Sequence, residues 1–348
     1  MKQHGEHPAW HGLKVVAVVP CLDEEAAVGR VVSDLLRHVP GIQVYVYDNG
    51  STDRTAEVAR LAGAAVRKEA EPGKGNVVRR AFADLDADVY VLVDGDDTYD
   101  ISAAPGMIEA LLHGPFDHVL GVRRQVAAGA YRKGHESGNQ FFNRLTSFAF
   151  RTQVADMLSG YRVMSRRFVK SFPALSHRFE IETELTIHAA NSRVPQLEMP
   201  VGFRDRPAGS ESKLRTYHDG MRILKLLVRL LFRERPLFVM LLVTAALTLT
   251  GLLLGLPVVV EYARTGLVPR FPTAILASGV MILAGVALVL GVLLSEVSAG
   301  RTENRRLHYL SLPAPRWSDA SAAPGGAAPT PSPQRAEAPT EPTEGSGR

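Results

Sequence analysis

The stretch YVLVDGDDTYD, residues 90–100, joins an apolar run to four aspartates that lie within seven residues. Carboxylates this close repel one another unless a positive charge lies among them. An Asp-x-Asp pair with glycine between its members suits a hard divalent cation, Mg²⁺ or Mn²⁺, because these ions prefer oxygen ligands. The alternative is an acidic turn that caps a helix near Ser102, and the spacing alone leaves both interpretations open.

The apolar run is one of three short segments, rich in β-branched residues, that predict strands buried on both faces: Lys14–Pro20, Gln43–Asn49 and Asp88–Asp96. Helical patterns separate or follow them: 24–38, 53–62 and 75–85. This alternation predicts a Rossmann-like, mostly parallel α/β sheet with right-handed crossovers. Polar residues end all three strands: Asp23, Glu24, Asp48, Asn49, Asp94 and Asp96. Ligands bind at the carboxyl ends of such strands, so we expect a site there.

The pattern between residues 118 and 206 is weaker. Further strands are predicted from three segments: 118–124, 154–165 and 195–204. Two helices are predicted beside them: 138–150 and 179–190. Earlier in the chain, the Gly-rich loop EPGKGN lacks the spacing of a P-loop, but it would let Lys74 approach a phosphate closely.

The later part of the chain carries membrane signals. Residues 216–235 alternate Leu and Ile with Arg and Lys at helical spacing, which predicts a basic amphipathic helix in the membrane interface. An ordinary helix facing a protein core is the alternative. Residues 237–260 and 273–294 contain no charged residue, and each run is long enough to cross a hydrocarbon core of about 30 Å.

The loop between these two runs is short, so they predict a transmembrane hairpin. Basic residues flank the pair: Arg222, Lys225, Arg229, Arg233, Arg235, Arg301, Arg305 and Arg306. The loop itself holds only Arg264 and Arg270, and the positive-inside rule therefore places both ends in the cytoplasm. The net charge is only +4 and its basic excess gathers beside the membrane runs, which favours a lipid bilayer over nucleic acid as a partner. The membrane helices could also support a homo-oligomer.

These signals predict five regions. They are a disordered N-terminus (1–13), an α/β domain (14–213), an amphipathic juxtamembrane helix (214–235), the hairpin (236–298) and a cytoplasmic tail (299–348). The tail is rich in Pro and Ala and has few large apolar residues, so most of it is expected to be disordered. The single cysteine, Cys21, excludes an internal disulfide and suits a reducing compartment.

The motifs VVPCLDEE, DNGSTDRT, GKG and VDGDDTYD resemble, in this order and spacing, the family-2 glycosyltransferases of the GT-A fold. The later stretches DMLSGYRVMSRR, FEIETEL and RPAGSESKL, followed by an amphipathic helix and a hairpin, are similar to polyprenyl-phosphate glycosyltransferases, the group that contains dolichyl-phosphate mannose synthase. The resemblance covers about residues 14–294. Each motif is weak alone, whereas the ordered set is specific.

The resemblance implies roles for individual residues on the donor side. Pro20, Asp23 and Glu24 would bind the nucleotide, with Asp23 standing where asparagine is usual. Asp48 would hold the nucleoside. Three residues would bind the metal, although Thr98 stands where glutamine is frequent: Asp94, Asp96 and Thr98.

On the acceptor side, the resemblance implies that Arg123 faces phosphates. A basic segment would meet the lipid phosphate through Arg206, Ser212 and Lys213. Asp96, Arg123 and Arg206 are therefore the expected catalytic residues.

The implied activity is inverting transfer of a hexose from a nucleotide sugar to a polyprenyl phosphate, with UDP-sugars favoured over GDP-mannose. The acceptor phosphate is already ionised and needs no strong general base. Three histidines are therefore expected to be structural or surface groups: His135, His177 and His188. Glu180, Glu182 and Glu184 either position the sugar or line a helix. Two alternatives are a membrane glycosyltransferase with another lipid or glycan acceptor and a catalytically inactive adaptor for a sugar flippase.

Overall fold

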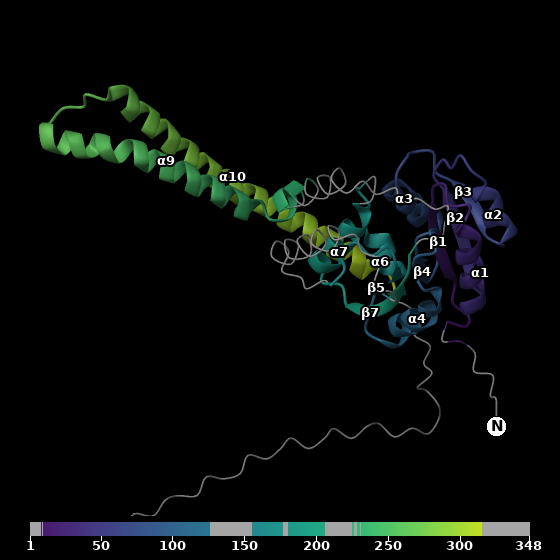
Figure 1. The fold of residues 1–348 in the computed structure, drawn as a ribbon. Helices are drawn as coiled ribbons and strands as arrows, with labels where there is room; N and C mark the ends of the chain where they lie inside the picture. The colour runs from purple at the N-terminus through teal and green to yellow at the C-terminus, as the bar shows by residue number, and fades with distance from the viewer. Residues whose placement is uncertain are drawn as a thin grey trace, which may run out of the picture. The chain divides into compact units, whose positions relative to one another are not determined.

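The computed structural model describes residues 8, 10–125, 155–176, 180–205, 225, 228–229 and 231–314. These residues form a seven-stranded sheet with helices on both faces, followed by two long helices, α9 and α10 (Figure 1). The strands are β1 (Val15–Cys21), β2 (Gln43–Asp48), β3 (Ala65–Lys68), β4 (Val89–Leu92), β5 (His118–Gln125), β6 (Arg162–Ser165) and β7 (Gln196–Phe203).

The sheet is mostly parallel, as predicted. Its order is β3-β2-β1-β4-β6-β5-β7. Strand β1 pairs in parallel with β2 and β4, β2 with β3, and β5 with β7. Only β6 runs antiparallel to its neighbours β4 and β5 among the strands of the described chain. The carboxyl ends of β1, β2, β4 and β5 therefore meet at one edge of the sheet.

Alternate residues of β1 build two separate cores, one on each face of the sheet. Val15, Ala17 and Val19 pack in a cluster with residues of α1 and α4, whereas Val16 and Val18 pack with residues of α3, α6 and α7. The helices are α1 (Val28–His38), α2 (Thr55–Leu61), α3 (Lys74–Asp84), α4 (Ala104–His113), α6 (Arg166–Ser171) and α7 (Ile181–Ser192), with a 3₁₀ turn η1 (Ile101–Ala103). Successive side chains of a strand point to opposite faces of the sheet, and helices cover both faces here. Nearly every position of β1 is therefore buried, which explains the unbroken apolar run in the sequence.

Several predicted boundaries were wrong for identifiable reasons. Strand β4 ends at Leu92, so Asp94 and Asp96 lie in the turn that follows it and not on the strand. Strand β6 is only the last third of the predicted segment, because Ser159 and Gly160 bond to Gly121 and Tyr99 in a turn.

Three of the described elements were not predicted: β3, α4 and α6. Strand β3 lies at the sheet edge and is half exposed, so it has no apolar pattern. Helix α4 opens with Pro105 and Gly106, which read as a loop although proline is well tolerated in a first helical turn.

The two long helices, α9 (Pro236–Thr265) and α10 (Phe271–Ser311), are candidate membrane spans by length and apolar composition. They lie side by side along the predicted hairpin (Figure 1). Small residues allow the close approach, since a side chain at Gly251 would overlap Met281 of the facing helix. Both helices extend beyond the predicted spans at each end of the connecting loop.

Helix α10 continues to Ser311, beyond residue 299, where the predicted tail begins. Contacts with the α/β domain stabilise this polar extension. Arg306 donates to the carbonyl of Asn191 at 3.2 Å, and the Tyr309 hydroxyl donates to the buried carboxylate of Asp117. Polar helices need such partners to form stably in water.

Some predictions fall outside the described residues. They concern residues 1–7, the helix at 138–150, most of the amphipathic helix at 216–235 and the tail from 315 to 348. Of the amphipathic segment, residues 225, 228–229 and 231–235 are described, and all of these except Arg235 are helical.

Candidate active site

The predicted strand ends come together around Cys21, the last residue of β1, which pairs with Asp48 at the end of β2. Burial raises the pKa of the Cys21 thiol, and four carboxylates raise it further: Glu24, Asp48, Asp94 and Asp96. A single buried thiol responds to all four groups because they surround the end of β1. The edge of the sheet is therefore strongly acidic.

Two glycines permit this crowding. A side chain at Gly95 would overlap the sulfur of Cys21, and one at Gly160 would overlap the carboxylate of Asp94. Gly160 lies just before the antiparallel strand β6. The insertion of β6 therefore places backbone directly against the first aspartate of the Asp-x-Asp pair.

Thr98 orients the second aspartate of the pair. Its hydroxyl donates to Asp96 Oδ1 at 2.6 Å and its backbone N–H donates to the same oxygen at 3.2 Å. Asp96 and Thr98 are both buried. The helix-capping alternative applies instead to Asp100, which accepts from the N–H and hydroxyl of Ser102 at 3.0 and 2.7 Å.

Lys74 lies between two carboxylates from distant parts of the chain. It is the first residue of α3, and its ammonium contacts Asp94 and Glu182 of α7. Burial by itself lowers the pKa of Lys74, but the two carboxylates raise it above the ordinary lysine value. Burial raises the pKa of Glu182, and Lys74 opposes that effect. Lys74, which the sequence predicts near a phosphate, thus neutralises part of the acidic cluster.

Asn49 holds the loop that leads to Lys74. Its side-chain amide donates to the carbonyls of Glu69 and Glu71 at 3.0 and 2.8 Å, and its oxygen accepts from the N–H of Gly73. Gly73 has a φ of 125°, a conformation that a side chain would strain. Sequence reasoning noted Asn49 as a polar strand end but missed this positioning role.

The loops after β1 and β2 are joined by hydrogen bonds. Asp23 Oδ1 accepts from the N–H of Thr52 at 2.7 Å, and Asp48 Oδ1 accepts from the N–H of Ser51 at 3.0 Å. The N–H of Glu24 donates to the hydroxyl of Thr55 at 2.7 Å. Asp23 and Asp48 therefore have structural bonds beside the nucleotide-binding roles predicted for them. Pro20 lies on β1 at the same edge.

Two arginines have different surroundings. Arg123, on β5, makes a bidentate ion pair with Asp156 at 2.7 Å for both contacts. Arg162 is fully buried at the start of β6, and burial lowers its pKa to about 10. It donates to the carbonyls of Ser159 and Glu182, each at 3.0 Å, and so fixes the start of α7. Sequence reasoning missed Arg162 because an isolated arginine reads as a surface residue.

Helix α7 places Glu182 and Glu184, whose roles the sequence left open, in different surroundings. Glu184 accepts from the backbone N–H groups of Leu175 and Ser176 at 3.0 and 2.7 Å, which is a structural role. Glu182 faces the candidate site. His188 is buried against Phe168 and Phe172, in line with the structural role predicted for it.

Five predicted residues lie outside the described part of the chain: Arg206, Ser212, Lys213, His135 and His177. Within the described residues, no group of three or more His, Cys, Asp or Glu side chains is arranged to hold a metal unaided. Asp94 and Asp96 still fit a hard cation, because Mg²⁺ commonly takes one or two carboxylates and completes its shell with water and substrate phosphates.

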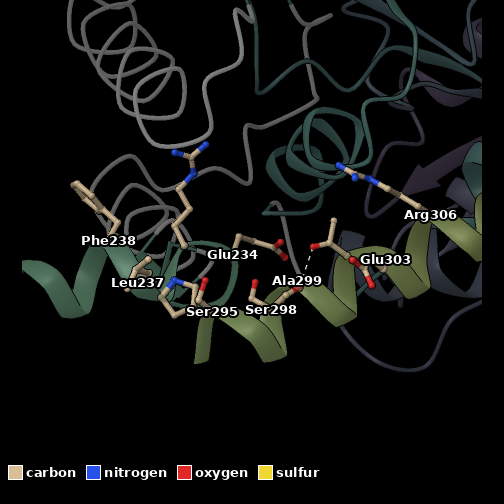
Figure 2. A pocket seen from close by; sticks show the side chains of 11 residues that line it. Glu234, Leu237, Phe238, Ser295, Ser298, Ala299, Glu303 and Arg306 are labelled. Carbon is tan, nitrogen blue, oxygen red and sulfur yellow. Dashed lines mark hydrogen bonds between the residues drawn. The ribbon is translucent and has the colours of Figure 1, made fainter. Parts of the chain in front are cut away.

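A pocket of about 440 Å³ lies elsewhere, between the start of α9 and residues 295–306 of α10 (Figure 2). The Glu234 carboxylate points toward α10 in Figure 2, and it accepts from Arg305 at 2.8 Å. Thr302 donates to the carbonyl of Ser298 at 3.1 Å. None of the residues that line this pocket is a predicted site residue, so we place the candidate active site at the strand ends.

Comparison with known proteins gives consistent results. Residues 16–172 match the family model described as glycosyl transferase family 2. The chain is 33% identical over 300 residues to glycosyltransferase AglJ of Haloferax volcanii, which covers 85% of this chain and 98% of that protein. It is 31% identical over 221 residues to a dolichyl-phosphate hexose transferase of the same organism, covering 64% of this chain and 95% of the relative.

Solved structures share the fold. Glucosyl-3-phosphoglycerate synthase from Mycobacterium tuberculosis, determined with Mn²⁺, UDP and glucosyl-3-phosphoglycerate, superposes with a TM-score of 0.53 at 22% identity. The match covers 64% of this chain and 80% of that one. The same enzyme has been determined with Mg²⁺ and UDP. This likeness supports the predicted GT-A architecture of the catalytic domain.

Proposed function

The chain belongs to glycosyltransferase family 2, and we propose that it transfers a hexose from a nucleotide sugar to a polyprenyl phosphate at the cytoplasmic face of a membrane. The observation that carries this proposal is the likeness to a dolichyl-phosphate hexose transferase over 95% of that relative. Two candidate membrane spans beyond the catalytic domain support a lipid acceptor.

On the donor side, the acidic strand ends support a metal-dependent nucleotide sugar. Asp94 and Asp96 would hold Mg²⁺ or Mn²⁺, and Thr98 would orient Asp96. When bound, the cation would stabilise the negative charge of the leaving nucleoside diphosphate. Pro20, Glu24 and Asp48 would contact the nucleotide. A UDP-sugar is the favoured donor, and the fold is shared with an enzyme determined with Mn²⁺ and UDP-glucose.

In the proposed reaction, an oxygen of the acceptor phosphate attacks the anomeric carbon from the face opposite the leaving group. The bond from that carbon to the nucleoside diphosphate breaks as the new bond to the lipid phosphate forms, which inverts the configuration. Arg123, Arg206 and Lys213 would offset the repulsion between the two anionic substrates, and Ser212 would contact the acceptor phosphate. The acceptor is already ionised, so no side chain needs to remove a proton from it.

On the membrane side, α9 and α10 would anchor the enzyme as a transmembrane hairpin, with the catalytic domain and both termini in the cytoplasm. The basic residues before α9 support this orientation. The membrane also holds the long-chain acceptor near the strand ends. The hairpin could pair with a second copy of the chain.

The test uses the purified full-length enzyme in detergent with Mn²⁺ or Mg²⁺. UDP-glucose, UDP-N-acetylglucosamine and GDP-mannose are each supplied with polyprenyl phosphate, with a glycolipid, or without acceptor. We expect nucleoside diphosphate release and a labelled lipid product only with polyprenyl phosphate, and neither with the Asp96→Asn variant. Transfer to the glycolipid alone would establish the alternative acceptor, and no donor turnover under any condition would favour the adaptor hypothesis.

A further inference from the structure

Asp97 follows the Asp-x-Asp pair and has an unusual backbone. Its φ is 56°, in the left-handed region that glycine adopts at the lowest cost. Its side chain is only 3% exposed, although it lies next to the acidic cluster. A buried aspartate in strained backbone requires surroundings that hold it there.

Two arginines from distant elements hold Asp97. Arg30 of α1 donates to Oδ2 at 3.1 Å. Arg204, directly after β7, donates to Oδ1 at 2.8 Å and to the Asp97 backbone carbonyl at 3.0 Å. Both carboxylate oxygens thus have arginine partners, so Asp97 is placed to anchor the turn and not to bind a cation.

Backbone pairing extends this junction. The N–H of Arg204 donates to the carbonyl of Thr98 at 2.9 Å, and the N–H of Asp100 donates to the carbonyl of Gly202 at 3.0 Å. The rings of Tyr99 and Phe203 meet edge to face at 5.2 Å. The turn that carries Asp96 and Thr98 is thereby fastened to the end of β7.

The arginine partners contribute little to global stability. Asp97 is buried, but the side chains of Arg30 and Arg204 are 65% and 47% exposed, so solvent screens both ion pairs and weakens their contribution to stability. Glycine at position 97 would make the same turn without strain. A strained aspartate with two weakly stabilising partners is therefore better explained by local order at the adjacent site than by folding.

We propose that Asp97 is a positioning residue that, chiefly through Arg204, fixes the turn so that Asp96 and Thr98 are preorganised for the metal and the nucleoside diphosphate. The inference rests on the proposed function for the donor side only. It does not depend on the identity of the acceptor. Protein groups that are already ordered bind a nucleotide and metal more tightly, because less conformational entropy is lost on binding.

The test measures binding of UDP, and of GDP, to the full-length protein by calorimetry at saturating Mn²⁺, together with the melting temperature without ligand. Asp97→Gly keeps the backbone conformation and removes the anchor. We expect its melting temperature to equal or exceed that of the wild type, because the strain at φ 56° is relieved. We expect its nucleotide affinity to fall about tenfold, the loss typical of one charge-assisted hydrogen bond.

Arg204→Gln should weaken nucleotide binding at least as much as Asp97→Gly, because it also removes the contact to the Asp97 backbone carbonyl. The affinity of Arg204→Lys should lie between those of Arg204→Gln and the wild type. The double variant Asp97→Gly with Arg204→Gln should bind no more weakly than Arg204→Gln alone, because both changes break the contact between the Arg204 guanidinium and the Asp97 carboxylate. Arg30→Gln is the matched control. It removes one arginine partner of the Asp97 carboxylate but leaves both Arg204 contacts. The nucleotide affinity of this variant should therefore stay within about twofold of the wild type.

The outcomes separate the two hypotheses. A wild-type protein that binds neither UDP nor GDP with Mn²⁺ overturns the proposed donor chemistry, and this inference with it. A wild type that binds while Asp97→Gly and Arg204→Gln bind equally well overturns the inference alone. Equal losses in Arg30→Gln and Arg204→Gln, or additive losses in the double variant, would also reject it.

Discussion

Replacing Lys74 by methionine removes the only described cation that contacts both Asp94 and Glu182. The side chains of Lys74 and Glu182 are 8% and 5% exposed, so water cannot compensate well for the lost ammonium. Breaking a buried ion pair by removing one partner costs about 3–5 kcal/mol. Asp94 is 28% exposed, so solvent screens its ion pair with Lys74 and the loss of this pair costs less free energy. We therefore assign most of the cost to Glu182.

At pH 7 the expected loss lowers the melting temperature by about 6–20 °C for a domain of this size. The loss should shrink as the pH falls. Burial already raises the pKa of Glu182, and without Lys74 only a backbone hydrogen bond opposes that effect. A carboxyl group whose pKa is higher in the folded state than in the unfolded state binds its proton on folding, so acid stabilises the variant relative to the wild type.

The assay is thermal unfolding in detergent, followed by tryptophan fluorescence at pH 7 and pH 5. Lys74→Arg keeps the charge and should lose much less, and Lys68→Met, at an exposed position on β3, is the matched control that should melt like the wild type. Adding Glu182→Gln to Lys74→Met should restore about 2 kcal/mol, because it removes the unpaired buried charge. A Lys74→Met variant that melts within about 2 °C of the wild type at both pH values would refute this account of the cluster.

Three further predictions concern other parts of the molecule. Asp96→Asn should reduce turnover at least about a hundredfold while the melting temperature moves by only a few degrees, since the carboxylate is assigned to the metal and not to the core; near-normal turnover at ordinary Mg²⁺ would reject that assignment. Tyr309→Phe should cost about 1.5–3 kcal/mol in chemical denaturation, because it removes a hydrogen bond to the buried Asp117 carboxylate; an unchanged midpoint would mean that the α10 extension does not dock. His118 and His188 have their pKa lowered to about 3 by burial, so they stay neutral when folded but charge on unfolding below pH 6.5. Stability should fall from pH 6.5 toward pH 3, by about 2 kcal/mol per histidine between pH 7 and pH 5, and replacing His188 by leucine should remove its share of that slope.

The gathering of polar strand ends at one edge of the sheet could be predicted from sequence because its signals are local. The apolar β-branched runs specify β1, β2 and β4, and the helical segments between them allow only a parallel arrangement. Parallel strands bring their carboxyl ends to one edge, so Asp48, Asp94 and Asp96 had to approach one another. The long uncharged runs likewise predicted α9 and α10, because length and composition are sufficient to recognise a candidate membrane span.

Tertiary structure alone decided which charges meet. Lys74 contacts Glu182 across 108 residues of chain, and Arg204 contacts Asp97 across 107. No local pattern encodes such pairs, and a charged residue taken alone reads as a solvated surface group. The buried Arg162 and the polar extension of α10 show the same limit, since each depends on partners from other elements. The sequence by itself therefore determined which groups reach the edge of the sheet, whereas packing determined their partners, because the strength of a charge contact depends on burial and distance that only the folded chain fixes.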